Sequence, residues 1–125
     1  MVLALAEISL EASRPESNLF RAYRISVGRD LFGEWTVATV YGRIGCEGRE
    51  RVAQCATLAQ AKRLVATALR QRMSAPRRIG CAYRLVRLVD APEIVLADTL
   101  PPPLLMRLAS AGASLGDAAG AGVAP

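Results

Sequence analysis

An aromatic residue and an arginine flank a glycine in the middle of the chain, in the run Tyr41-Gly42-Arg43, and further glycines follow at Gly45 and Gly48. In an extended strand the side chains of Tyr41 and Arg43 point the same way, because alternate residues share a face. A tyrosine ring stacks on a sugar or a base, and a guanidinium binds phosphate through two parallel hydrogen bonds. The glycines leave backbone N–H groups accessible to a phosphate. The run therefore predicts a nucleotide-binding site.

The same strand also allows a purely structural interpretation. Trp35, Val37 and Thr39 share a nominal face with Tyr41, and Trp35 and Val37 favour burial. Tyr41 would then belong to the core, and Arg43 would simply mark the exposed end of the strand. Both interpretations stay open on these residues alone.

The charge distribution favours an anionic partner. The 125-residue chain has 16 Lys and Arg against 11 Asp and Glu, a formal net charge of +5. Between residues 20 and 84 there are 13 basic and four acidic residues. Arg49 and Arg51 share a face of the next predicted strand, and we expect them to extend a phosphate-binding surface beside Arg43. Arg77 and Arg78 are expected in the loop after a helix; an idle, solvated surface is the alternative for all four.

Several kinds of chemistry are excluded by composition. The chain has no histidine, which removes Ser-His-Asp and Cys-His catalysis and imidazole metal sites. Its three cysteines, at 46, 55 and 81, have no CxxC spacing for a zinc site. Asp30 and Glu34 flank a turn, with nothing to place a nucleophile or metal beside them. We therefore expect no enzyme activity, no cofactor and no metal.

The chain is expected in the cytoplasm. Its N-terminus lacks a basic stretch, and the first apolar run ends at Glu7, which is unlike a secretory signal. An odd, unclustered set of cysteines is typical of free thiols in a reducing compartment. The apolar runs fall far short of the roughly 20 residues that cross a bilayer, so no membrane association is expected.

The predicted elements are mostly strands. Alternating apolar residues indicate strands at 3–10, 20–27, 34–44, 49–56 and 82–89, with a loop at 11–18 and a tight turn at 45–48. Thr57 and Gln60 form a capping box for a helix that extends to Met73, before Pro76. The order β-β-β-β-α-β predicts an α+β fold, an antiparallel sheet of about five strands with one amphipathic helix packed on it.

The composition changes after residue 89. We therefore expect a folded domain over 1–89 and a Pro-, Ala- and Gly-rich tail over 90–125, with a short helix at 103–110. The apolar residues Leu104, Leu105 and Leu108 in that helix are candidates for docking to the same chain, to a protein partner or to a second copy of the chain.

A set of landmarks in this order resembles a WGR domain. It comprises 18–23 (NLFRAY), 30–35 (DLFGEW), 41–45 (YGRIG) with Gly48 close behind, the pair Arg77-Arg78, and Gly80 followed by Tyr83-Arg84. The resemblance covers about residues 3–88. Similar modules occur in bacteria, alone or within larger proteins, and in the DNA-dependent poly(ADP-ribose) polymerases.

The resemblance implies an antiparallel sheet with a helix and a role at DNA breaks. In the polymerases the module binds a strand break, where the motif Trp packs on the nucleotide and the motif Arg joins DNA to neighbouring domains. By position, Tyr41 would be the stacking residue and Arg43 the contact arginine. The chain departs from the family pattern because Tyr replaces Trp, which implies weaker capture of an end. The polymerases' catalytic domain would not fit in the remaining residues.

The leading hypothesis is therefore a nucleic-acid-binding module for DNA ends or strand breaks, using Tyr41, Gly42, Arg43, Arg49, Arg51, Arg77 and Arg78. We expect no base-sequence specificity, since no base-reading helix is apparent. The alternative is a protein–protein interaction adaptor, with the basic face on an acidic partner and the apolar C-terminal segment joining two copies.

Overall fold

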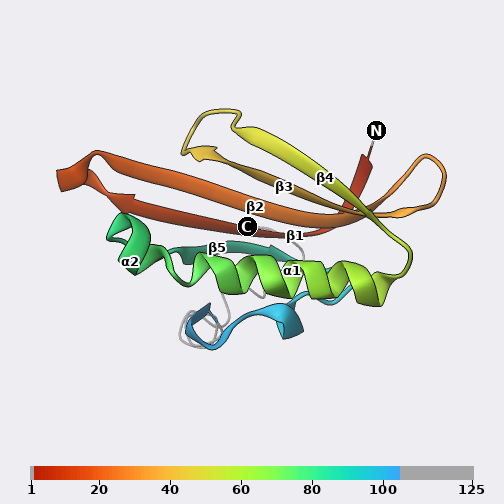
Figure 1. The fold of residues 1–125 in the computed structure, drawn as a ribbon. Helices are drawn as coiled ribbons and strands as arrows, with labels where there is room; N and C mark the ends of the chain where they lie inside the picture. The colour runs from red at the N-terminus through yellow and green to blue at the C-terminus, as the bar shows by residue number, and fades with distance from the viewer. Residues whose placement is uncertain (1, 105–125) are drawn as a thin grey trace.

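Five antiparallel strands form one sheet in the computed structural model, which describes residues 2–104, and the helices lie across one of its faces (Figure 1). In space the strands follow the order β4-β3-β2-β1-β5, so β4 and β5 are the edges. This confirms the predicted α+β class and the antiparallel sheet. The strands are β1 (Val2–Arg14), β2 (Leu19–Asp30), β3 (Trp35–Arg43), β4 (Arg49–Cys55) and β5 (Arg84–Val89).

The first hairpin is longer than its composition predicts. Residues 11–14 were expected in a loop but continue β1 and pair with β2, with Ala12 opposite Arg21. The physical reason is that the alternation persists through the polar residues: Ala12 is buried against the helix side, while Glu11 and Ser13 point to the other face. The connection is only the short 3-10 helix η1 (Pro15–Ser17) and Asn18, whose φ of 52° closes the turn.

Helix α1 (Leu58–Arg72) begins as its capping residues predict. The Gln60 amide donates to Thr57 Oγ1 at 3.1 Å, and Gln60 Oε1 accepts from the Ala56 amide at 2.9 Å. Its buried face is Ala61, Val65 and Leu69. No helix within residues 2–104 is long and apolar enough to cross a membrane.

The core lies between α1 and one face of the sheet. Alternate residues of the two central strands fill it, including Ile8 and Leu10 from β1 and Ile25 and Val27 from β2, all at most 1% exposed. The described helices lie on this side of the sheet, which we call the helix side, and the opposite side we call the open face (Figure 1). Polar and small residues such as Ser26 and Thr36 line the open face, as the register requires.

The segment after β5 packs against the helix side. Ile94, Leu96, Leu100 and Leu104 are at most 4% exposed and belong to the same core cluster. Leu104 is thus packed within its own chain, which is one of the two expectations for this side chain, and it is not exposed for a partner. Leu105, Leu108 and most of the predicted helix at 103–110 lie outside the described residues. The domain boundary at residues 89 and 90 stays a prediction.

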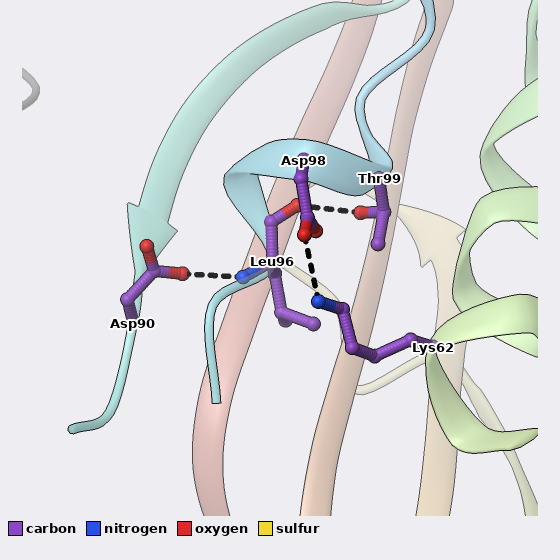
Figure 2. Close-up of polar contacts among 5 residues, drawn as sticks. All are labelled: Lys62, Asp90, Leu96, Asp98 and Thr99. Atoms are coloured by element: carbon purple, nitrogen blue, oxygen red, sulfur yellow. Dashed lines mark hydrogen bonds and ion pairs between the residues drawn. The ribbon is translucent and has the colours of Figure 1, made fainter. Parts of the chain in front are cut away.

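Polar contacts hold this segment in place (Figure 2). Asp90 Oδ1 accepts from the Leu96 amide at 2.8 Å, and the Thr99 hydroxyl donates to the Leu96 carbonyl, closing the turn at η2 (Ala97–Thr99). Lys62 Nζ on α1 forms an ion pair with Asp98 Oδ2 at 2.8 Å. The segment is therefore tied to α1 by apolar packing and by one charged contact.

Candidate functional site

Tyr41 is half-buried near the end of β3, on the helix side of the sheet. It packs against the edge of the core cluster and lies directly opposite Tyr23 on β2 and Arg49 on β4. Tyr41 lines four hollows, and we name three of them the strand-end groove, the inner groove and the small groove. Tyr41 thus packs against the core and also lines open grooves.

Gly42 and Gly48 allow the chain to fold back on itself beside Tyr41. A Cβ atom at Gly42 would lie 2.8 Å from Gly48 Cα, and one at Gly48 would lie 2.7 Å from the Tyr41 carbonyl oxygen. Gly48 also has a φ of 78°, a conformation that other residues rarely adopt. The glycine of the motif therefore has a packing role: it lets the loop at 44–48 lie close against β3.

Arg43 is exposed at the end of β3. Its guanidinium carbon lies 4.8 Å from the centre of the Phe20 ring, and Nη2 donates to Asn18 Oδ1 at 3.3 Å. Arg21 lies opposite Arg43 in the sheet register. With Arg49, these residues line the strand-end groove of about 520 Å³, which also includes Tyr41 and Gly42. The ring and the amide hold the guanidinium in place and leave its remaining N–H groups for a ligand.

Arg49 and Arg51 share one face of the edge strand β4, as their spacing predicts. That face is the helix side of the sheet. Arg49 pairs with Tyr41 and Arg51 with Thr39, and both side chains are exposed. Arg51 lines the inner groove, of about 360 Å³, between β3, β4 and the end of α1.

Arg77 and Arg78 are helical, and the expectation of a loop there was wrong. They belong to the short helix α2 (Ala75–Ile79), which starts with Pro76 in its first turn and ends at Gly80 in the left-handed conformation. Pro at such a position is tolerated because its missing N–H has no partner in a first turn. Arg78 lines the small groove of about 70 Å³ beside Tyr41, whereas Arg77 lines none of the three grooves.

Two further arginines, which were not predicted as site residues, line grooves that Tyr41 also lines. Arg21 lines the strand-end groove and the small groove, and Arg72 lines the small groove and the inner groove. Arg72 stacks on Tyr23, with 4.7 Å from its guanidinium carbon to the ring centre. Burial raises the pKa of Tyr23, and the Arg72 guanidinium opposes that rise. Arg21 lies near Tyr41 through the register of β2 and β3, and Arg72 through the packing of α1 on the sheet, so no local pattern in the sequence indicated either residue.

We call the arginines that line the three grooves the arginine cluster, namely Arg21, Arg43, Arg49, Arg51, Arg72 and Arg78. The ion pairs found within residues 2–104 are elsewhere: Glu7 with Arg24, Glu11 with Arg84 and Asp98 with Lys62. No member of the cluster has a carboxylate partner in that part of the chain. Six guanidinium groups that have no carboxylate partner within residues 2–104 thus line grooves that share Tyr41, and such a cluster is suited to an anion.

The acidic residues of the described part do not assemble into a reactive centre. Asp30 accepts hydrogen bonds from the amides of Phe32 and Glu34 through Oδ1 and from Gln54 through Oδ2. Desolvation acts to raise the pKa of Asp30, but these hydrogen bonds outweigh it and the pKa is lowered. Within residues 2–104 no three His, Cys, Asp or Glu side chains are grouped as metal ligands would be.

A family model described as the WGR domain matches residues 6–75, which is more than half of the chain. The match spans β1 to the first residue of α2 and includes Tyr41 and Arg43, while Arg77 and Arg78 lie beyond it. No curated protein matches the chain significantly.

Proposed function

The chain belongs to the WGR domain family, whose members are nucleic-acid-binding modules, and on that premise we propose that it binds DNA at ends or strand breaks. Arg43 and its neighbours Arg21 and Arg49 pair with backbone phosphates, and Tyr41 stacks on the terminal nucleotide. Stacking of a base on an aromatic side chain contributes about 1–3 kcal/mol and does not depend on which base it is. We propose a role in binding alone, since a WGR domain is a binding module and not a catalytic domain.

One observation carries this proposal: the arginine cluster has no ion-pair partner among residues 2–104 and lines grooves that share the half-buried Tyr41. Phosphate contacts supply affinity without reading sequence. Each neutralised phosphate on duplex DNA adds about −0.9 to the slope of log K against log salt concentration. Binding should therefore weaken steeply as salt is added.

The test compares an open end with no end. Fluorescence anisotropy is measured with a blunt, 5′-phosphorylated duplex and with a closed dumbbell of the same sequence, at several salt concentrations. The expected result is salt-sensitive binding with a preference for the open duplex. Arg43→Ala should weaken it by about tenfold, the scale of one lost charge-assisted contact. Arg63→Ala, an equal change of charge on the exposed face of α1, is the control.

A second pair of variants separates stacking from charge. Tyr41→Phe keeps the ring and should retain the preference for the open duplex, whereas Tyr41→Leu should lose the preference but keep most of the salt slope. Equal binding to the open duplex and the dumbbell by the wild type would leave only a non-specific basic module. Absence of binding to either DNA at low salt would refute the proposed function.

A further inference from the structure

The inner groove has a lining unlike that of an ordinary surface hollow. Six residues form it: Tyr23, Thr39, Tyr41, Arg51, Gln71 and Arg72. Each has a side chain with at least one hydrogen-bond donor, and none is acidic. The groove lies on the helix side of the sheet, between β3, β4 and the end of α1, so it is separate from the tip of β3 where Arg43 lies.

Arg72 brings an unused donor to this place. Its Nε atom is buried and has no hydrogen-bond acceptor within the described part of the chain. Its guanidinium carbon lies 4.7 Å from the centre of the Tyr23 ring, and this contact restrains the group that lines the groove. Arg51, also in the lining, forms neither an ion pair nor a side-chain hydrogen bond with any described residue. Two guanidinium groups without a carboxylate partner in the described part of the chain thus line one hollow.

A hollow on the open face differs from the inner groove in the charge of its lining. This hollow, of about 160 Å³, is lined by Arg24 and Arg43 but also by Glu11 and Glu47. The two carboxylates offset the two guanidinium groups, so that hollow attracts a phosphate less than the inner groove does. The inner groove, at about 360 Å³, has room for a phosphate and part of the attached sugar.

The inner groove is also continuous with the proposed end-binding site. It shares Tyr41 with the strand-end groove, and it shares Tyr41 and Arg72 with the small groove, where Arg21 and Arg78 lie. Each of these three grooves, which share Tyr41, therefore also has at least two arginines in its lining.

We propose that the inner groove is a second binding site, specific for a phosphate group, and that Arg51 and Arg72 hold it. The phosphate belongs to the nucleotide next to the one stacked on Tyr41, so this inference rests on the proposed function. The end of the nucleic-acid strand then binds at two places: Arg43 contacts it at the tip of β3, and the inner groove beside Tyr41 binds the next phosphate.

The first experiment changes Arg51, which is exposed and makes no contact on which the fold depends. Binding of the open duplex is measured against salt concentration for the wild type, Arg51→Gln and the control Arg63→Gln. We expect Arg51→Gln to bind about tenfold more weakly and to lose about 0.9 from the salt slope, the value for one phosphate. An Arg51→Gln protein that matches Arg63→Gln in both quantities would overturn the proposal.

The second experiment identifies the source of the phosphate and uses small probes. Backbone amide shifts of Arg51, Gln71 and Arg72 are followed by NMR as pyrophosphate, adenosine 5′-monophosphate or adenosine is added at constant ionic strength. Saturable shifts with the two phosphorylated probes, none with adenosine, and their loss in Arg51→Gln support a phosphate site. An absence of saturable shifts at these residues counts against it.

The two experiments also separate this inference from the function on which it rests. If the wild type fails to bind the duplex at low salt while the phosphorylated probes still bind, the end-binding function is refuted, and the inner groove is a site for a small phosphorylated molecule. If the duplex binds with its normal slope in Arg51→Gln and the probes give no shifts, end binding survives and the inner-groove proposal fails.

Discussion

The residue Gly42 illustrates how one missing side chain shapes the site. It allows Gly48 to approach within a distance that a Cβ atom would forbid, and the loop at 44–48 then lies against β3 beside Tyr41. From the sequence alone, the role expected for Gly42 was to leave its N–H group accessible to a phosphate. The structure assigns it a steric reason that is independent of any ligand.

Gly42→Ala should therefore destabilise the fold. A Cβ atom 2.8 Å from the backbone of Gly48 forces a backbone shift, and overpacking of this kind costs about 1–3 kcal/mol. Gly45→Ala is the control: at Gly45 no atom lies within 4 Å of the added group, and only the φ of 88° opposes it. Urea unfolding measures both. A smaller loss of stability for Gly42→Ala than for Gly45→Ala would contradict the steric account.

At the scale of elements, Asp30 organises the turn between β2 and β3. The pKa of Asp30 is lowered in the folded state below its ordinary value near 3.8. The carboxylate thus stabilises the fold at pH values above about 3.8, and this contribution is lost as the pH falls through the lower, folded value. We expect the urea midpoint to fall between pH 5 and pH 3, and Asp30→Ala to show a smaller fall. Glu16→Ala, which removes an exposed carboxylate that forms no ion pair within residues 2–104, is the control.

The segment after β5 is a second element whose role is testable. Leu96 is fully buried, and Leu96→Ala should cost about 2–5 kcal/mol, as large-to-small core substitutions do. The neighbouring Val95 is 47% exposed, so Val95→Ala should cost much less. Thermal unfolding of the two variants compares them directly. Equal, small losses would show that 90–104 does not contribute to the core in solution.

Most elements could be predicted from the sequence because their signals are local. The alternation in 34–44, the cap at Thr57 and the turn glycines at 45 and 48 each act over a few residues. The extension of β1 to Arg14 and the burial of Leu96 depend on which distant segment packs there, and local patterns do not record that. Arg43, Arg49 and Arg51 could be predicted as candidates because their spacing along two neighbouring strands is a local signal. Arg72 joins Tyr41 only through the packing of α1 on the sheet, which no local pattern records.

At the scale of the whole molecule, the arginine cluster places like charges close together without counter-ions in the described part of the chain. Such repulsion destabilises a fold, most of all at low ionic strength. Arg49→Gln should therefore stabilise the protein by roughly 0.3–1 kcal/mol at low salt, and the gain should shrink as salt rises. Arg84→Gln, which removes the partner of Glu11 on the open face, should give no gain. Thermal unfolding at two salt concentrations measures the difference, and a gain in both variants would argue against repulsion within the cluster.

The edge strand β4 has one more consequence for the molecule in a crowded cell. Six of its seven residues are exposed, and its outer backbone groups have no neighbouring strand in the described structure. Unpaired edges promote aggregation, and charged side chains along an edge oppose it by repelling a second copy. Besides being candidate ligands for phosphate, Arg49 and Arg51 therefore place charges on the edge strand that oppose pairing with a second copy of the chain. A protein of this fold that no longer binds an anion would still need these two charges to resist aggregation.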